Sequence, residues 1–307
     1  MAPDWRDALA PRLRGEALRA APLAARTSIR VGGPADLLVR PADADDLVAC
    51  LRGARELGAP VHVLGGGANT LVADRGVRGV VVRLPAELGG ETLEAPRLVL
   101  PAGLPTARVV QRAHGLGLVG CEFLRGIPGT LGGALAMNAG TPAGEMRDVV
   151  THVELASADG ARELPAKELG FAYRTCRLPP GAVVTRIGLL LRAGDVTRAA
   201  RAMDDDWARR SATQPLELPS FGSTFRNPPG DFAGRLLQEA GLKGARIGGA
   251  EVSALHANFV VNRGGATARD VILLMRQMRD AVRERFGVTL ETEVRLVGDF
   301  ADDERLD

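Results

Sequence analysis

The sequence has few of the residues that build a disulfide scaffold or a metal site. Its three cysteines, Cys50, Cys121 and Cys176, are odd in number and far apart, which argues against a disulfide framework and suits a reducing compartment. The four histidines show no mutual spacing of the kind found in metal sites. We therefore expect no disulfide framework and no bound metal.

Long apolar runs and an excess of one charge are also missing. No run reaches the roughly 18 residues that a membrane-spanning helix needs, and the opening Met-Ala-Pro-Asp-Trp-Arg-Asp contains no apolar signal region. A net charge of +2 gives no indication of a nucleic-acid or membrane-surface partner. With 46% hydrophobic and 25% charged residues, the composition is that of an ordinary soluble protein. Its 307 residues predict more than one domain, at about 150 residues per domain.

Glycine, in contrast, is plentiful at one turn that follows a short apolar strand, Gly65-Gly66-Gly67-Ala68-Asn69-Thr70. No Lys-Ser/Thr follows at P-loop spacing, and Thr70 stands where a dinucleotide fingerprint needs its third glycine. What remains is a run of backbone N–H groups able to bind an anion, with a plain β-turn as the alternative.

A second glycine-rich stretch, Gly120–Gly144, has little charge after Arg125. Pro128 fits the first turn of a helix, where its missing N–H is not needed. Small residues then leave room for a flat group against that helix: Gly132, Gly133, Ala134, Ala136 and Ala139. Tight core packing and ligand contact both explain this stretch.

Capping residues and apolar spacing predict several other elements. Asp43 and Asp46 begin a helix that ends at Gly58, and Thr267 with Asp270 begins one whose methionine and aliphatic stripe we assign to the core. Residues 28–40 predict two short strands around a Gly-Gly-Pro turn, and residues 289–298 a closing strand. Asp204–Asp206 are interpreted as a solvated helix face.

Three separated patterns coincide in one known family. They are GGGANTLV at 65–72, FLRGIPGTLGGALAMNAG at 123–140, and the trio AYRTC, GSTFRNP and ETEVRLVG at 172–176, 222–228 and 291–298. TSIRVGGPAD at 27–36 belongs to the same pattern. Together they resemble the UDP-N-acetylenolpyruvoylglucosamine reductases, flavoproteins of cell-wall precursor synthesis. The resemblance extends from about residue 27 to residue 298, and its motifs are specific in combination but weak singly.

The resemblance implies an α+β chain with a vanillyl-alcohol-oxidase-type FAD-binding fold. Its two FAD-binding subdomains would span residues 1–60 and 61–193, followed by a substrate-binding domain at 194–307. The FAD would be held non-covalently by the two glycine segments and by an arginine of the last strand. The residues implied are Gly65, Gly66, Gly67, Ala68, Asn69, Thr70, Leu71, Ile127, Pro128, Gly129, Gly133, Asn138, Ala139, Gly140 and Arg295.

The implied reaction transfers hydride from NADPH, through FAD, to the β-carbon of UDP-N-acetylglucosamine enolpyruvate, followed by protonation at C2. Negative charge then develops on the adjacent carboxylate and must meet fixed donors. Arg174 matches the family's arginine and stays charged. Glu293 would act beside it, and Ser223 would deliver the proton to C2. Substrate-binding residues would be Tyr173, Arg226, Asn227 and Lys243, in a chain that acts as a monomer.

Three departures from the family pattern limit what carries over. Ala68 stands where many members have serine, and Cys176 replaces the usual serine after Tyr-Arg-x. Tyr173 is the only tyrosine, so the tyrosine loop of some members is missing and the chain resembles the shorter subclass. The sequence also contains no phosphate-binding fingerprint for NADPH.

Two other functions remain open from the sequence. One is an FAD oxidase or dehydrogenase of an alcohol or sugar, with flavin held covalently through His62 or Cys121. The other is a UDP-sugar- or flavin-binding module without catalysis, which would consume no NADPH.

Overall fold

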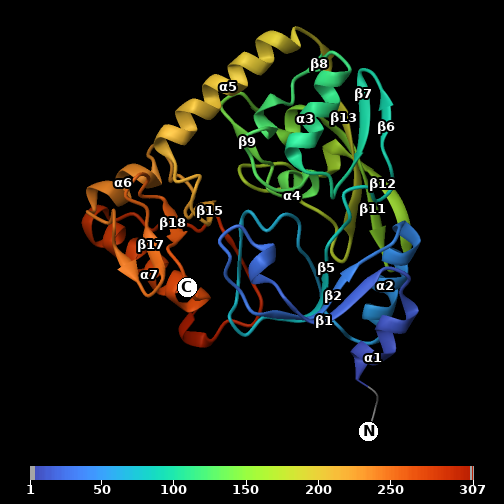
Figure 1. Cartoon of the computed structure of the whole chain (residues 1–307), viewed down its shortest axis with the longest axis horizontal. Helices are drawn as coiled ribbons and strands as arrows, with labels where there is room; N and C mark the ends of the chain where they lie inside the picture. Colours follow the sequence, from blue (N-terminus) through green and yellow to red (C-terminus); the bar gives the residue numbers. More distant parts are fainter. Residues whose placement is uncertain (1–3, 305, 307) are drawn as a thin grey trace. The chain divides into compact units, whose positions relative to one another are not determined.

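A computed structural model of the chain describes residues 4–304 and 306. Short 3-10 turns lie at Ala10–Arg12, Ala24–Arg26, Glu122–Leu124, Met146–Asp148, Ala166–Glu168 and Asp302–Glu304. The α-helices (Figure 1) are α1 (Trp5–Leu9), α2 (Ala44–Glu56), α3 (Thr106–Gly115), α4 (Leu131–Ala136), α5 (Val196–Thr213), α6 (Ala233–Glu239) and α7 (Ala268–Phe286).

The strands form three larger sheets. A five-stranded antiparallel sheet has the order β12 (Gly160–Pro165), β11 (Val150–Ser157), β13 (Val183–Leu190), β7 (Arg97–Pro101) and β6 (Thr92–Glu94). A four-stranded sheet has the order β1 (Glu16–Pro22), β2 (Pro34–Arg40), β5 (Val77–Val82) and β3 (Val61–Val63). A four-stranded antiparallel sheet has the order β15 (Ser220–Ser223), β18 (Phe259–Asn262), β17 (Ala250–Val252) and β16 (Arg246–Ile247).

Three two-stranded pairings complete the sheet structure. The antiparallel ones join β10 (Gly144–Glu145) to β9 (Gly140–Thr141) and β14 (Arg192–Ala193) to β8 (Leu118–Val119). The parallel one joins β19 (Arg295–Val297) to β4 (Thr70–Val72).

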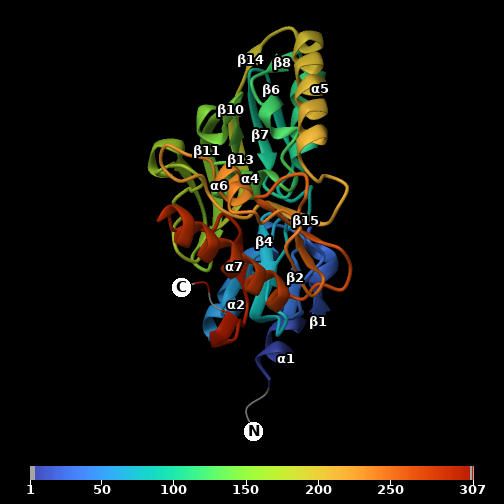
Figure 2. The ribbon, with the colours of Figure 1, turned by 90° about the vertical axis from the view of Figure 1, so that its left-hand side faces the viewer.

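The described residues divide into two compact units. The first comprises Met1–Arg19, Asp36–Gly66 and Gly79–Trp207, and the second comprises Ala20–Ala35, Gly67–Arg78 and Ala208–Asp307. In the first unit, α4 packs against β13 and α2 packs against β11. In the second, α7 (the long red helix of Figure 2) packs on α6 and on β16 and β17 according to their residue contacts. The division into three domains at residues 60 and 193 stays a prediction.

The two helices predicted from capping residues are confirmed. Asp43 caps α2 by accepting the N–H of Asp46, and Thr267 and Asp270 form the predicted capping box of α7. The methionine stripe of α7 is core, since Met275 and Met278 have no exposed surface. Capping and apolar spacing act within one helix, and this explains why the sequence alone predicts both helices.

Two strand predictions were only half right. Residues 28–40 contain one strand, β2, instead of two, and residues 28–33 form no strand. In that segment Thr27 Oγ1 bonds to the backbone of Val31, which satisfies groups that a strand would pair elsewhere. The closing strand is limited to β19, because its partner β4 offers only three residues for pairing.

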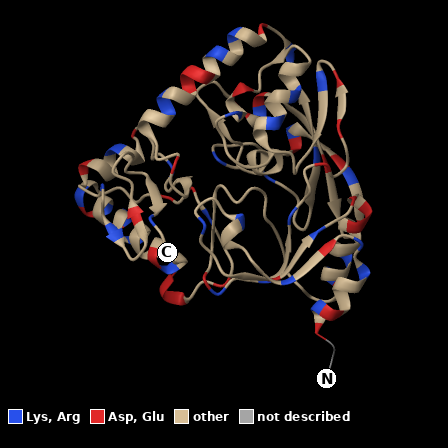
Figure 3. Ribbon diagram, viewed as in Figure 1, with Lys and Arg blue, Asp and Glu red and all other residues tan. Residues whose placement is uncertain are grey.

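The long helix α5 has one buried residue, Met203, and charges of both signs along its length (Figure 3). Asp204 is exposed and pairs with Arg125 at 3.0 Å, and Asp205 is exposed as well, so the interpretation of these acids as a solvated face is confirmed for both residues. Of the helices in the described part of the chain, none is both long and apolar enough to cross a membrane.

Asp74 caps α7 from a distant part of the sequence, which leads to a first prediction. Its carboxylate accepts the N–H groups of Ala268 at 2.8 Å and Arg269 at 3.0 Å, the first two donors of the helix. Asp74→Ala is expected to lower the free energy of unfolding by about 1–2 kcal/mol, because it leaves two helix donors without a cap and removes a charge that complements the helix dipole. Urea unfolding measures the loss.

The control for this experiment is Asp280→Ala in the same helix. Asp280 pairs with Arg283 on the surface, and such a pair contributes less than about 1 kcal/mol. Equal losses from the two variants would contradict the capping role of Asp74.

Candidate active site

The glycine turn after β3 requires glycine because backbone groups approach it closely. A Cβ atom added to Gly66 would lie 2.5 Å from the Cα of Gly129, and one added to Gly65 would lie 2.8 Å from Oγ1 of Thr130. Gly67 has a φ of 65°, where glycine carries no steric cost. The turn therefore packs directly on the start of the second glycine segment.

The same turn holds backbone donors that the protein leaves unused. The N–H groups of Gly65, Gly66, Gly67 and Ala68 donate to no acceptor within residues 4–304 and 306, although all four residues are buried or half-buried. Buried N–H groups are almost always satisfied by some partner, and a run of free N–H groups binds anions. This donor set fits the pyrophosphate of a dinucleotide cofactor.

The expected position of Pro128 in the first turn of a helix is wrong. The helix α4 starts only after its capping residue Thr130, and Gly129 has a φ of 121° that no helical residue adopts. Thr106 forms hydrogen bonds to the backbone that precedes α4. Its Oγ1 donates to the carbonyl of Ile127 at 2.6 Å, and its N–H donates to the carbonyl of Gly129 at 3.2 Å. Tertiary hydrogen bonds thus hold Ile127 to Gly129 as an ordered loop.

Core packing accounts for most of the small residues in this segment. A Cβ atom on Gly132 would lie 3.0 Å from the Cβ of Ala102, and Ala134 and Ala139 are buried. Gly133 is different because it is exposed. Of these four small residues, only Gly133 fits the expectation of a bare surface for a flat ligand.

Arg174 lies in a tight turn with a strained backbone. Ala172 and Thr175 exchange two backbone hydrogen bonds of 3.1 and 3.2 Å, so Tyr173 and Arg174 form the tip. Arg174 has a φ of 56°, in the left-handed region that few residues other than glycine adopt. Its Nη1 donates to the carbonyl of Gly140 at 3.5 Å, and its guanidinium lies 5.1 Å from the Tyr173 ring centroid. Strain of this kind is concentrated at functional sites.

Asn138 holds the Arg174 turn from inside the core. Its side chain is fully buried: Nδ2 donates to the carboxylate of Glu145 at 3.0 Å and to the carbonyl of Ala172 at 3.2 Å, while Oδ1 accepts the N–H of Arg147 at 3.0 Å. Both polar atoms of this side chain therefore have protein partners. The predicted contact of Asn138 with a cofactor stays a prediction.

In the second unit, Ser223 and Glu293 lie on segments that are hydrogen-bonded to each other. The N–H of Glu293 donates to the carbonyl of Thr224 at 2.9 Å, directly after Ser223. Asn69 of the glycine turn donates through Nδ2 to the carbonyl of Glu293 at 3.0 Å, and the N–H of Arg295 donates to the carbonyl of Asn69 at 3.1 Å. The structure therefore brings together two predicted catalytic residues and the end of the predicted cofactor turn.

The predicted substrate-binding residues differ in how much of their polar surface is in use. Nη1 of Arg226 lies 3.6 Å from the carboxylate of Glu291, and its Nε is buried without a partner among the residues that the structure describes. Asn227 accepts the N–H of Ala233 at 3.1 Å and so caps α6, while Lys243 is exposed. Arg226 thus keeps a donor for an anion, whereas the Asn227 carbonyl is already used.

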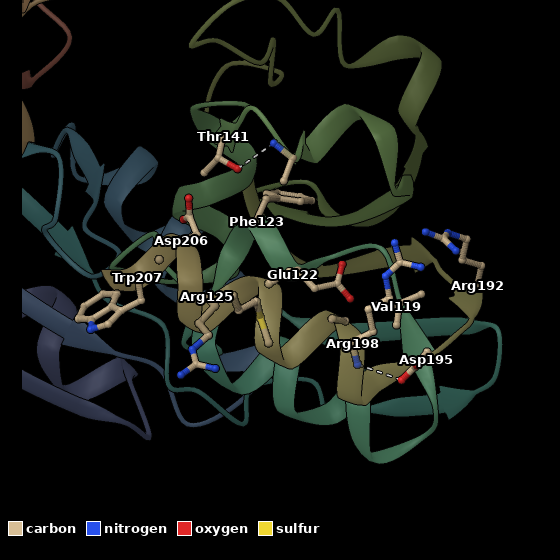
Figure 4. A pocket seen from close by; sticks show the side chains of 15 residues that line it. Val119, Glu122, Phe123, Arg125, Thr141, Arg192, Asp195, Arg198, Asp206 and Trp207 are labelled. Carbon is tan, nitrogen blue, oxygen red and sulfur yellow. Dashed lines mark hydrogen bonds between the residues drawn. The ribbon is translucent and has the colours of Figure 1, made fainter. Parts of the chain in front are cut away.

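A cavity of about 500 Å³ next to the second glycine segment contains none of the predicted site residues (Figure 4). Phe123, Met203 and Trp207 are among its apolar side chains, and Glu122 and Arg192 are among its charged ones. The predicted site is therefore distinct from this cavity.

Covalent attachment of flavin through Cys121 is disfavoured. The residue is fully buried, and burial raises the pKa of its thiol to about 12. Because the thiolate is the nucleophile, a thiol with that pKa is inert at neutral pH. His62 lies in the middle of β3, opposite Val81 of β5.

Sequence reasoning missed two residues that shape the site. Thr130 caps α4 and packs on Gly65, and a threonine before a run of small residues is a cap signal that could have identified it. Glu145 bonds to Asn138 and forms an ion pair with Arg147. No local signal marks Glu145, because its role depends on Asn138 being buried.

Known proteins resemble this chain along almost its whole length. Residues 214–297 match the family model described as UDP-N-acetylenolpyruvoylglucosamine reductase, C-terminal domain, and residues 35–163 match the FAD binding domain. The UDP-N-acetylenolpyruvoylglucosamine reductase of Anaeromyxobacter dehalogenans (strain 2CP-C) is 65% identical over 300 residues, which are 98% of this chain and 91% of that relative. The one from Myxococcus xanthus is 54% identical over 285 residues, 91% of each chain.

A solved structure agrees with these relatives. The crystal structure of UDP-N-acetylenolpyruvylglucosamine reductase from Thermus caldophilus superimposes with a TM-score of 0.80 at 40% identity, covering 93% of this chain and 99% of that one. The expected fold is confirmed: a vanillyl-alcohol-oxidase-type FAD-binding fold followed by a C-terminal domain, in a chain of mixed α and β content. The chain belongs to the family of UDP-N-acetylenolpyruvoylglucosamine reductases.

Proposed function

We propose that this chain reduces UDP-N-acetylglucosamine enolpyruvate to UDP-N-acetylmuramate, with NADPH as hydride donor and FAD as cofactor, in peptidoglycan precursor synthesis. Family membership supports this activity. The observation that supports this activity at the level of individual residues is a set of hydrogen bonds. These bonds join the Ser223 segment to the Glu293 segment and also include Asn69 of the glycine turn. These hydrogen bonds support a role for both residues near the end of the glycine turn.

The chain's own residues fit FAD. The unused N–H groups of the turn from Gly65 to Ala68 are donors for the pyrophosphate, and exposed Gly133 offers a surface without a side chain. When bound, the flavin supplies hydride chemistry that no side chain of the protein can perform.

Three side chains are assigned to stabilising the negative charge on the substrate and to protonating it at C2. Arg174 binds the substrate carboxylate and stabilises the negative charge that develops on it, because a guanidinium remains protonated and offers two parallel donors. Glu293 is assigned to the same step as a second functional group. Ser223 donates its hydroxyl proton to C2, a step that a weak acid can perform only for a strongly basic carbon next to it.

Substrate binding is assigned to exposed and half-buried polar groups. The half-buried guanidinium of Arg226 and the exposed ammonium of Lys243 are donors for the diphosphate. Tyr173 is the only tyrosine of the chain and lies at the exposed tip of the Arg174 turn. We place the enzyme in the shorter subclass, in the cytoplasm and acting as a monomer.

The oxidase alternative is not favoured. Relatives that are 65% and 54% identical are reductases by name, and the buried Cys121 thiol is unsuited to covalent attachment of flavin. A binding module without catalysis would not need a strained arginine such as Arg174.

The proposed function is tested by an NADPH oxidation assay with and without the enolpyruvyl UDP-sugar. Purified protein is expected to be yellow, to bleach with NADPH under anaerobic conditions, and to regain its colour when the enolpyruvyl sugar is added. Air alone should restore the colour far more slowly. Absence of bound flavin, or equally fast recovery with air alone, would contradict the proposal.

A further inference from the structure

The strand β15 ends at Ser223, yet the backbone beyond it remains as fully hydrogen-bonded as a strand. The β15–β18 register is irregular between Ser220 and Ser223, where Gly222 has a φ of 80°. Thr224 and Phe225 follow and are almost completely buried. Their backbone groups therefore need partners that no regular ladder supplies.

One buried residue, Asn258, supplies most of those partners. Asn258 precedes β18 and is 3% exposed. Its Oδ1 accepts the N–H of Phe225 at 2.9 Å, and its Nδ2 donates to the carbonyl of Phe225 at 2.8 Å. Its backbone carbonyl also accepts the N–H of Thr224 at 2.8 Å. The carboxamide thus extends the hydrogen bonding of the sheet to Phe225, two residues past Ser223.

The opposite edge of the same segment carries Glu293. Phe225 forms an antiparallel bridge with Thr292, in which the N–H of Glu293 donates to the carbonyl of Thr224 and the N–H of Arg226 donates to the carbonyl of Glu291, both at 2.9 Å. The segment after Ser223 is therefore held between Asn258 on one side and the Glu293 segment on the other.

The side chain of Thr224 adds no hydrogen bond that could replace those from Asn258. Oγ1 of Thr224 has no hydrogen-bond partner among the described residues. Asn258 is itself fixed, because its N–H donates to Nδ1 of His256 at 3.2 Å. A carboxamide suits the position because it offers one acceptor and one donor side by side, whereas a carboxylate offers acceptors only.

We propose that Asn258 is a positioning residue that sets Ser223 against Glu293 through the backbone of Phe225. The inference rests on the proposed function. Asn258 touches neither substrate nor cofactor in this role. Its loss shifts the hydroxyl of Ser223 from the carbon that receives the proton, and misplacement by about 1 Å can cost about 100-fold in rate.

The test compares Asn258→Asp with Asn262→Asp. Asn262 is the last residue of β18, the strand that Asn258 precedes. It also bonds backbone groups through both side-chain atoms, but those groups belong to Ile29, Gly264 and Ala266. Both variants therefore replace a donor with an acceptor in the same sheet. Only the first faces the Ser223 segment.

Anaerobic stopped-flow spectroscopy measures flavin reduction by NADPH and flavin reoxidation by the enolpyruvyl sugar as two separate reactions. Asn258→Asp is expected to lower the saturating rate of reoxidation by about 10- to 100-fold while flavin reduction stays within about twofold. Asn262→Asp should leave both rates near those of the natural protein. In a Ser223→Ala background, Asn258→Asp should add little, since the two changes remove one function.

Three results would overturn the inference: reoxidation of a folded, flavin-loaded Asn258→Asp protein at the natural rate, equal slowing of both reactions, or full multiplication of its effect in the Ser223→Ala background. If Asn258→Asp does not fold, Asn258→Ser, which keeps one donor and acceptor, is measured by the same criteria. Failure of the natural protein to be reoxidised by the enolpyruvyl sugar would instead contradict the proposed function.

Discussion

Ser223→Ala is expected to leave the reduction of bound flavin by NADPH unchanged and to slow flavin reoxidation by the enolpyruvyl sugar by about 10²- to 10⁴-fold, the usual contribution of a positioned proton donor. The asymmetry follows from the chemistry. Proton delivery to C2 belongs only to the reaction with the enolpyruvyl sugar, and the Ser223 hydroxyl has no part in accepting hydride from NADPH. Loss of one hydroxyl group changes little else, because Ser223 keeps its backbone pairing with Phe259.

The same anaerobic measurement provides the control. Ser220→Ala makes an identical change three residues earlier in β15, where Ser220 pairs with Val261 and has no proposed role. Its two rates should match those of the natural protein. Reoxidation of the Ser223→Ala protein at the natural rate would remove Ser223 from the mechanism and leave the family assignment untouched.

The motifs of the sequence identify Arg174, Ser223 and Glu293, but they do not contain the interactions that place them. Helix α7 was predictable because Thr267 and Asp270 cap it locally. The hydrogen bond from Glu293 to Thr224 joins residues that are far apart in the sequence, and no local sequence pattern predicts it. Contacts between distant residues therefore had to come from the structure.

The error at Pro128 has the same origin. Proline is common in the first turn of a helix, and the prediction that Pro128 starts a helix rested on this local preference. The structure follows different constraints: Thr106 binds the carbonyls on both sides of Pro128, and Gly129 takes a φ of 121°. Local preference was overridden by tertiary hydrogen bonds, at a place where the chain must approach Gly66 closely.

Asn138 has side-chain partners that its motif does not reveal, while its predicted contact with the cofactor stays a prediction. It lies in the MNAG pattern and was predicted to contact the cofactor. The structure uses its carboxamide to join Glu145, Arg147 and Ala172. A buried side chain and an exposed one look the same in a sequence, so this distinction could not be predicted.

Substitutions of Arg174 are expected to separate catalysis from stability. Arg174→Lys keeps the positive charge but loses the planar pair of donors, and it should slow reoxidation by the enolpyruvyl sugar by about 10²- to 10³-fold, as loss of one transition-state donor does. Arg174→Ala and Arg174→Gly should slow it at least as much. Flavin reduction by NADPH, followed in the same instrument, should change far less in the lysine variant.

The alanine and glycine variants share the same loss of side-chain function but differ at the backbone. Arg174 has a φ of 56°, which costs a residue with a Cβ atom about 1–2 kcal/mol and costs glycine nothing. Glycine loses more chain entropy on folding, which offsets about 0.5–1 kcal/mol of that difference. Arg174→Gly should therefore be more stable than Arg174→Ala by up to about 1.5 kcal/mol in urea unfolding, with equally poor catalysis. Equal stability would mean that the turn relaxes when the arginine is removed, and a lysine variant with the natural rate would contradict the role of Arg174. The expected result would mean that the protein keeps a strained backbone at this turn because the strain places the guanidinium.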